Sequence, residues 1–327
     1  MIWSLQVLRF VAASMVVYVH AAQSALTVTG SPGLLPHNIA GLGLSGVDLF
    51  FVLSGVVIAK TAPSLTALQF AWRRIRRIVP IYFLCCIPAL IVALPNGIGW
   101  RDLLATFLLW PATDVMTAPL LGVAWTLSFE MLFYGCATLI LVDRRWLPIL
   151  LIAYALAFAL RSFGPIFQFL GNPIIIEFVL GVVIARLPMA RFGTFGIPLG
   201  IALLLGSGVL ESAPHGGTLD FLTGDDNLYR VLVFGIPAAM IVYGTMHITA
   251  RPGVWTYLGD ASYTLYLVHT FAVTSLLALW MTYPVPANII VLTGVIASVV
   301  LAWRVHELVE KPILKAFGRR QLHVATA

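Results

Sequence analysis

Long, uninterrupted apolar runs dominate this sequence, as at residues 147–160 and 289–303. A helix needs roughly 20 mostly apolar residues to cross a bilayer, whereas a spanning β-strand needs about ten residues of alternating polarity. The runs are continuous rather than alternating, which favours helices. Because 60% of the residues are hydrophobic and only 10% are charged, a water-soluble fold could not bury the apolar surface. The sequence therefore predicts an all-α, polytopic transmembrane bundle.

The 327 residues accommodate about ten spans joined by short loops. The first run is not followed by a small-residue cleavage site and is predicted to be a retained helix. The apolar stretch 103–111 is too short to span and is predicted to be interfacial or re-entrant. Residues 1–327 are expected to form a single domain. The predicted spans lie near 5–26, 42–60, 79–95, 120–142, 146–162, 173–187, 194–210, 230–247, 257–281 and 285–306.

Positive charge is distributed unevenly between the two sets of loops. One set contains Arg73, Arg74, Arg76, Arg77, Arg144, Arg145, Arg186, Arg191, Arg251, Lys311, Lys315, Arg319 and Arg320. The other set contains only Arg101, Arg161 and Arg230. Cytoplasmic loops carry an excess of Lys and Arg, so both termini are predicted to be cytoplasmic and the protein to lie in the inner (plasma) membrane. The same bias explains the net charge of +6, and nucleic acid is not expected as a partner.

Ionisable side chains inside the predicted spans are the candidates for a functional site, because they are costly to place in a bilayer and are often functional there. They are Arg9, His20, Asp48, Glu130, Glu177, Asp260, His269 and Arg304.

Arg9 and His20 lie eleven residues apart in the first span, which is close to three helical turns, so they share one face about 16 Å apart along the axis. Asp48 and Glu130 are predicted to lie at the same outer depth as His20. A carboxylate beside an imidazole orients it and raises its basicity, which suits general-base catalysis. The alternative is a set of separate structural contacts: a snorkelling Arg9, a hydrogen-bonded His20 and carboxylates that join helices.

Four arginines occupy five positions before the third span: Arg73, Arg74, Arg76 and Arg77. Arg74 and Arg77 are three residues apart, so on a helix they share a face and could clamp phosphates. Orientation of the protein and binding of anionic lipid headgroups are the alternative interpretation.

Aromatic residues flank Glu130, with Trp125 before it and Tyr134 after it. Such residues could form an aromatic belt at the membrane surface or the wall of a sugar-binding cleft. The sequence alone does not separate these two interpretations.

Two features near the C-terminus carry weaker signals. Tyr266 and His269 lie three residues apart in the ninth span, and for His269 a structural role is favoured. Glu310 and Lys311 follow the last span, where a surface ion pair at a helix end is expected.

Four motifs occur in an order and spacing that resemble those of the acyltransferase 3 family of membrane acyltransferases, and the resemblance extends over nearly the whole chain. The motifs are Arg9 with His20, the Gly-Val-Asp-x-Phe-Phe-x-x-Ser-Gly segment at 46–55, Arg74-x-x-Arg77 followed by Ile78, Pro80 and Tyr82, and the segment 125–134 that contains Glu130. Two departures occur: Thr126 replaces the usual Ser, and Met131 stands where many members have a second Glu.

The resemblance implies transfer of an acyl group, usually acetyl, from cytoplasmic acyl-coenzyme A to a hydroxyl of a carbohydrate or glycolipid at or across the bilayer. Acyl-coenzyme A is then a co-substrate, with no metal and no permanently bound cofactor expected. The hypothesis makes His20 the general base or transient acyl acceptor, oriented by Asp48 or Glu130. Arg9 would guide the donor or stabilise an oxyanion. The predicted donor-binding residues are Arg73, Arg74 and Arg77, and the predicted acceptor-binding residues are Trp125, Tyr134, Tyr266 and His269.

A proton-coupled transporter or exporter is the alternative from another class, since buried His, Asp and Glu also form proton relays. Transport sites are typically marked by matched interrupted helices in two halves of the chain, and this sequence has no such pair.

Overall fold

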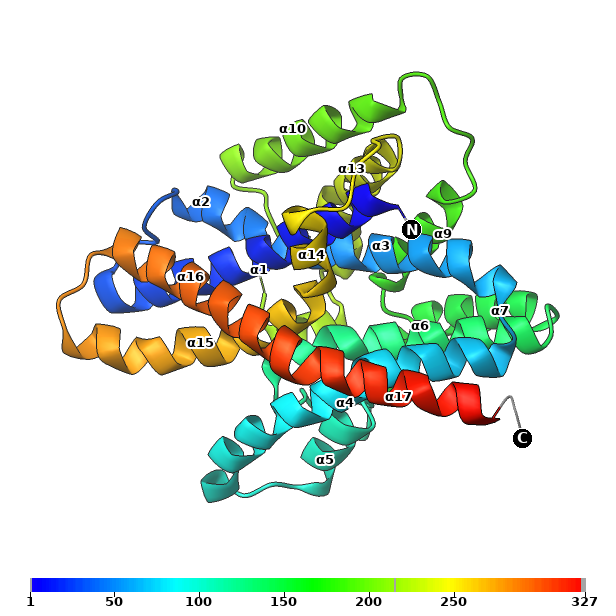
Figure 1. The fold of residues 1–327 in the computed structure, drawn as a ribbon, viewed down its shortest axis with the longest axis horizontal. Helices are drawn as coiled ribbons and strands as arrows, with labels where there is room; N and C mark the ends of the chain where they lie inside the picture. The colour runs from blue at the N-terminus through cyan, green and yellow to red at the C-terminus, as the bar shows by residue number, and fades with distance from the viewer. Residues whose placement is uncertain (1, 215, 325–327) are drawn as a thin grey trace.

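The computed structural model describes residues 2–214 and 216–324, and Figure 1 shows that they fold into an assembly of helices. No β-strand occurs in these ranges, where a single isolated antiparallel bridge joins Ala112 to Met116. The predicted all-α, polytopic fold class is confirmed.

The α-helices follow one another along the chain with mostly short connections. They are α1 (Trp3–Thr29), α2 (His37–Ala40), α3 (Ser45–Thr61), α4 (Ala67–Ala93), α5 (Trp100–Phe107), α6 (Trp125–Val142), α7 (Trp146–Ala159), α8 (Pro165–Leu170), α9 (Ile175–Ile184), α10 (Gly196–Val209), α11 (Thr218–Thr223), α12 (Asn227–Arg230), α13 (Ile236–Met246), α14 (Val254–Asp260), α15 (Ser262–Thr282), α16 (Ala287–Val305) and α17 (Lys311–Val324). Two π-helical turns, Val231–Gly235 and His306–Glu310, connect α12 to α13 and α16 to α17.

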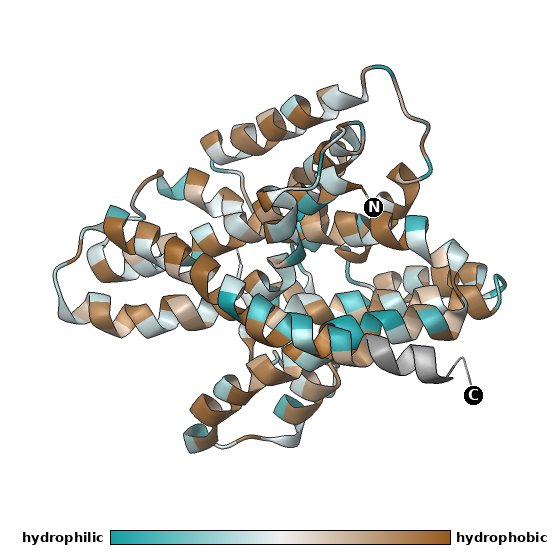
Figure 2. Ribbon diagram, in the orientation of Figure 1, coloured by the Kyte–Doolittle hydropathy of each residue, from teal (hydrophilic) through white to brown (hydrophobic). Residues whose placement is uncertain are grey.

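Eight helical segments of the described chain are long and apolar enough to cross a membrane. They are Trp3–Thr29, His37–Ser64, Ala67–Asn96, Gly122–Val142, Pro165–Ile184, Asn227–Met246, Ser262–Thr282 and Ala287–Phe317. The shorter apolar helices α7 and α10 lie where the two remaining spans were predicted. Figure 2 shows hydrophobic residues along most helices, with hydrophilic residues gathered where α17 passes α4.

Helix α4 begins about three turns earlier than predicted, at Ala67 rather than near residue 79. A capping box explains the early start, because the Thr66 hydroxyl accepts a hydrogen bond from the Gln69 amide while the Gln69 side chain accepts one from the Thr66 amide. The arginine cluster is therefore part of this helix.

Helix α5 is only eight residues long and too short to span, as predicted for this stretch. Figure 1 shows α5 and the C-terminal part of α4 projecting together from one side of the molecule. The loop after α5 is held by an ion pair between Arg101 and Asp114, and the hydrogen bond from Arg101 lowers the pKa of the Asp114 carboxyl.

Helix α1 lies at the centre of the fold, where it packs against α3, α14, α15 and α16. One hydrophobic cluster fills the space between α1, α3, α4, α6 and α15, and a second fills the space between α1, α3, α10 and α13. In Figure 1, α15 and α16 form a hairpin at one end of the molecule, while α3, α6 and α17 extend toward the other end. Residues on α1 and α3 therefore face several neighbouring helices at once.

Helices α3 and α9 touch through their backbones at Gly55 and Gly181. A Cβ atom added at Gly55 would lie 2.1 Å from the Phe178 carbonyl oxygen, and one added at Gly181 would lie 2.1 Å from the Val52 carbonyl oxygen. Small residues allow such close approach of helices in membranes. The contact fixes the separation of α3 and α9.

Substitution of Gly55 by alanine is expected to lower the free energy of unfolding by about 1–3 kcal/mol, because the added methyl meets backbone that cannot rotate away. Gly135 in α6 is the matched control, since a Cβ there meets nothing within 4 Å and Gly→Ala in a helix stabilises by about 0.8–1 kcal/mol. Thermal unfolding of the detergent-purified variants measures both changes. A Gly55→Ala protein as stable as Gly135→Ala would contradict the contact.

Candidate active site

A cavity lies between α1, α3, α4, α6 and α15, which are separated widely in the sequence. Its lining combines guanidinium, carboxyl and phenol groups with aliphatic and phenyl side chains. The lining residues are Arg9, Val47, Phe50, Phe51, Leu53, Ser54, Val57, Arg74, Arg77, Ile78, Thr126, Leu127, Glu130, Tyr134, Tyr263 and Tyr266.

Glu130 organises the polar part of this cavity. Its Oε1 atom accepts hydrogen bonds from the Ser54 hydroxyl at 3.0 Å and from the Tyr134 hydroxyl. The Arg74 guanidinium lies over the Tyr134 ring, 5.2 Å from its centroid, and donates to the Thr61 hydroxyl at 3.1 Å. Because Thr61 ends α3, Arg74 marks the end of the cavity that we call its mouth.

Positive charge exceeds negative charge in the cavity. The Arg9 Nε atom donates to the Ser262 hydroxyl at 3.3 Å, and Arg9 interacts electrostatically with Glu130, Arg74 and Arg77. Three guanidinium groups and one carboxylate leave a formal charge of +2 among the charged lining residues. Arginine forks match phosphate oxygens, so this environment suits a phosphorylated ligand.

The structure confirms that Arg74 and Arg77 share one face of a helix, since both line the cavity. Arg73 is exposed and lies outside the lining. The helical repeat explains the difference, because adjacent residues point about 100° apart around the axis.

Val47, Phe50 and Tyr266 line the apolar part of the cavity, which we call its end wall, and Val47 is the lining residue of α3 that is farthest along the helix from Thr61. The Tyr266 hydroxyl donates to the Val123 carbonyl oxygen at 2.9 Å and accepts from the Thr126 hydroxyl at 3.0 Å. The Phe50 and Tyr266 rings meet edge to face, with centroids 5.9 Å apart.

His20 and His269 form a contacting pair of imidazoles, with ring centroids 4.9 Å apart. His20 Nδ1 lies 2.8 Å from the Val16 carbonyl oxygen, and His269 Nδ1 lies 3.2 Å from the Leu265 carbonyl oxygen. Carbonyls only accept, so each Nδ1 carries its proton and each neutral ring keeps a lone pair on Nε2. Nε2 of His269 is buried without a hydrogen-bond partner in the described residues.

In the described residues no hydrogen bond joins His20 to Asp48 or Glu130, and each of the three has other partners. The Val16 carbonyl orients His20 through its Nδ1 atom. Glu130 instead lies in the cavity near the arginines. The Tyr266 ring stands between the two regions, since it lines the cavity and lies 6.0 Å from the His269 ring. The catalytic roles of these residues remain predictions.

Asp48 forms a buried, bidentate ion pair with Arg230, at 2.9 Å from Nε to Oδ1 and 2.7 Å from Nη2 to Oδ2. Their side chains are 0% and 1% exposed. The carboxyl group of Glu177, also fully buried, lies beside Asp48. The sequence-based prediction that Arg230 lies in a loop is wrong, because Arg230 ends α12 inside the bundle. Arg230 stands at the first residue of a predicted span, where the sequence alone does not distinguish a loop position from a buried one.

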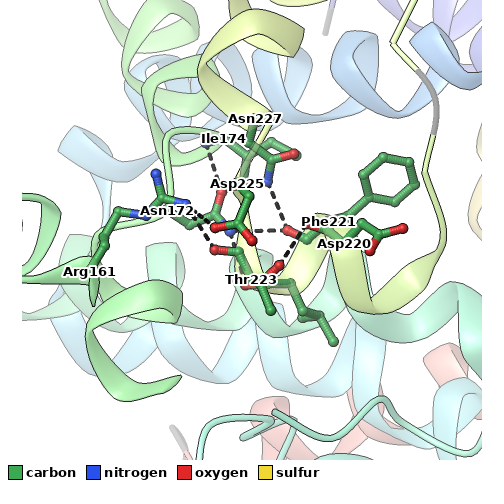
Figure 3. A network of polar contacts seen from close by, with 9 residues as sticks. Arg161, Asn172, Ile174, Asp220, Phe221, Thr223, Asp225 and Asn227 are labelled. Carbon is green, nitrogen blue, oxygen red and sulfur yellow. Dashed lines mark hydrogen bonds and ion pairs between the residues drawn. The ribbon is translucent and has the colours of Figure 1, made fainter. Parts of the chain in front are cut away.

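A network of amides, shown in Figure 3, holds the segment around α11 against the bundle. The Asn172 side chain donates to the Phe221 carbonyl at 3.0 Å and accepts from the Asn227 amide at 2.7 Å. Arg161 donates to the Thr223 carbonyl at 3.0 Å. Both asparagines are buried, so the segment is fixed by satisfied polar groups rather than by apolar contact alone.

This segment places Phe221 between Trp125 and Arg230. The Phe221 and Trp125 rings stack with centroids 5.0 Å apart, and the Arg230 guanidinium lies 4.5 Å from the Phe221 centroid. Trp125 is therefore a buried packing residue outside the cavity lining, unlike Tyr134 and Tyr266, which line it. Of the predicted acceptor-binding residues, His269 alone contacts His20.

The predicted surface ion pair between Glu310 and Lys311 is wrong. Glu310 is buried and binds His306 and Thr264, each at 2.5 Å. Lys311 instead binds Glu307. The π-helical turn rotates Glu310 inward, which a regular helical repeat does not predict.

Comparison with known proteins places these features in context. A family model described as "Acyltransferase domain", that of the acyltransferase 3 family, matches residues 2–306. The exopolysaccharide production protein ExoZ of Rhizobium meliloti (strain 1021) is 31% identical over 310 residues, covering 88% of this chain and 94% of ExoZ. The acyltransferase MdmB of Streptomyces mycarofaciens is 26% identical over 367 residues, covering 99% of this chain and 94% of MdmB. No solved structure matches the chain.

Proposed function

Since this chain belongs to the acyltransferase 3 family of membrane acyltransferases, we propose that it transfers an acyl group, in the simplest case acetyl, from acyl-coenzyme A to a carbohydrate hydroxyl. The observation that carries the donor assignment is the cavity lined by Arg9, Arg74 and Arg77, whose excess positive charge suits the phosphates of coenzyme A.

The donor is proposed to enter through the mouth, with its phosphates at Arg74 and Arg77 and its thioester toward the end wall. Arg9 lines the same cavity, where it would hold the thioester oxygen as negative charge develops. The arginine-rich segment of α4 lines the mouth, so we propose that this side of the protein, with both termini, lies in the cytoplasm and that the protein lies in the plasma membrane.

His20 is proposed to act on the thioester from the Tyr266 side of the cavity, because the Tyr266 ring lies between the cavity and the His20–His269 pair. Its Nε2 lone pair takes the proton of the acceptor hydroxyl. The hydroxyl oxygen then attacks the acyl carbon, the carbon–oxygen bond forms and the carbon–sulfur bond breaks. The coenzyme A thiolate leaves with the bonding electrons and takes a proton from water, while His20 releases its proton to water.

The acceptor assignment to carbohydrate rests on the relative that is an exopolysaccharide production protein. The contact of His269 with His20 supports a place for the acceptor beside this pair, because the buried Nε2 of His269 can accept a hydrogen bond from a second hydroxyl.

The experiment that tests the proposal is incubation of the purified, detergent-solubilised protein with acetyl-labelled acetyl-coenzyme A and an exopolysaccharide fragment. Release of free coenzyme A together with labelled carbohydrate is expected. A protein that binds no donor and releases no coenzyme A would contradict the proposal and favour the alternative of a proton-coupled transporter, which buried groups such as Asp48 and Glu177 also fit.

Substitution of Arg74 or Arg77 by glutamine is expected to raise the KM for acyl-coenzyme A about tenfold or more, with a smaller change in kcat. Each change removes a charged donor that holds phosphate in both the ground state and the transition state. Steady-state kinetics over a range of donor concentrations measures the effect. Arg145→Gln is the control, since this arginine side chain is 91% exposed. Equal KM values for all three variants would exclude the donor site.

A further inference from the structure

The residues of α3 that line the cavity differ in chemistry from one end of the cavity to the other. Along α3, the lining runs from Val57 near the mouth to Val47 at the end wall, a distance of about 15 Å for ten residues. Ser54, which binds Glu130, lies between them, and the lining residues that follow it toward the wall are the apolar Leu53, Phe51 and Phe50. The cavity therefore changes from charged to apolar along its length.

Phe50 is the end-wall residue best placed to limit the size of a ligand in the cavity. It remains partly exposed within a helix whose neighbouring residues are buried, and it belongs to the cavity lining. Its ring lies against Tyr266, which is held by hydrogen bonds to Val123 and Thr126. The wall therefore combines one ring fixed by polar contacts with one ring held by packing alone.

A ligand that fills such a cavity has an anionic part at one end and a small apolar part at the other. Acyl-coenzyme A in the proposed orientation presents its acyl group to the wall. We propose that Phe50, supported by Val47 and Tyr266, limits the acyl chain to a short one, an inference that rests on the proposed function.

Two physical reasons support this assignment. A phenyl ring at the apolar end of a cavity occupies the volume that further carbon atoms of an acyl chain would need. Close-packed protein interiors do not yield freely to added methylene groups. A single methylene in an apolar pocket changes specificity by about 10- to 200-fold, so one side chain is sufficient.

The test compares kcat/KM for acetyl-, butyryl- and hexanoyl-coenzyme A in wild-type protein and in Phe50→Ala. The wild type is expected to prefer acetyl, and Phe50→Ala is expected to raise the butyryl-to-acetyl ratio about tenfold or more. Val47→Ala removes less volume from the same wall and is expected to change the ratio in the same direction by a smaller factor. It keeps the test valid if Phe50→Ala does not fold.

Val57→Ala is the matched control, because it removes an aliphatic side chain from the same helix near the mouth, and its ratio should stay at the wild-type value. Unchanged ratios in folded Phe50→Ala and Val47→Ala would overturn the assignment while leaving the acyltransferase proposal intact. A wild type inactive with all three donors would overturn the proposed function, and the chain-length assignment with it. A shift as large in Val57→Ala would place the limit elsewhere in the cavity and would also overturn it.

Discussion

Replacing His20 with alanine is expected to reduce the rate of acyl transfer by a factor of about 10²–10⁴, the usual contribution of a general base. The ring is held by the Val16 carbonyl so that Nε2 is free to take a proton, and alanine has no group that can do so. The cavity that contains Arg74 and Arg77 is unaffected, so the KM for the donor should change little. Turnover of labelled acetyl-coenzyme A in the presence of acceptor measures both quantities.

The control for this prediction is His37→Ala, which removes an exposed histidine from α2 and should leave turnover near the wild-type rate. Near-normal transfer by His20→Ala would exclude His20 as base and as acyl carrier. Omission of the acceptor separates these two roles. Labelled acyl group retained on wild-type protein but not on His20→Ala would identify an acyl carrier, and its absence from both would identify a base.

Substitution of Arg230 by methionine is expected to destabilise the protein by about 3–5 kcal/mol, because it leaves the Asp48 carboxylate buried without its partner. The groups that contact the Asp48 carboxylate are the Arg230 guanidinium and the Glu177 carboxyl. Loss of Arg230 therefore leaves no buried cation among them. The double variant Asp48→Leu/Arg230→Met removes both charges and should recover most of the lost stability. Thermal unfolding of the three purified variants measures the coupling between the two residues.

The activity of the double variant decides whether Asp48 takes part in catalysis. A folded, active double variant would assign the pair to structure alone, whereas a folded, inactive one would support the sequence-based role of Asp48. The exposed pair Arg101 and Asp114 is the stability control, and its removal should change the unfolding temperature little. An Arg230→Met protein as stable as the wild type would contradict the importance of the buried pair.

The long apolar helices could be predicted from the sequence because apolar length is a property of one segment at a time. Backbone groups in lipid must be satisfied within the segment, so long apolar runs have few other structures available. The shared face of Arg74 and Arg77 was predictable for the same reason, since the helical repeat relates residues three apart within one helix.

Contacts between helices were not predictable in this way. Asp48 and Arg230 are 182 residues apart, and periodicity says which residues share a face without saying which helix that face meets. The predicted depth of Glu130 depends on a span that begins near residue 120, but α6 begins at Trp125, and Glu130 binds Ser54 of α3. Turns that depart from the regular repeat, as at His306–Glu310, further rotate side chains away from their expected faces.

The backbone contact between Gly55 and Gly181 has a consequence for motion. It joins α3 and α9 so closely that neither helix can slide or tilt without carrying the other. One wall of the cavity is therefore part of a rigid unit. Helix α4 also lines the cavity, contains Pro80 and Pro88 and has a largely exposed surface. Proline interrupts helical hydrogen bonding and permits a hinge. Any widening of the cavity to admit or release a bulky donor would then be expected at α4, which also carries the arginines proposed to bind the donor.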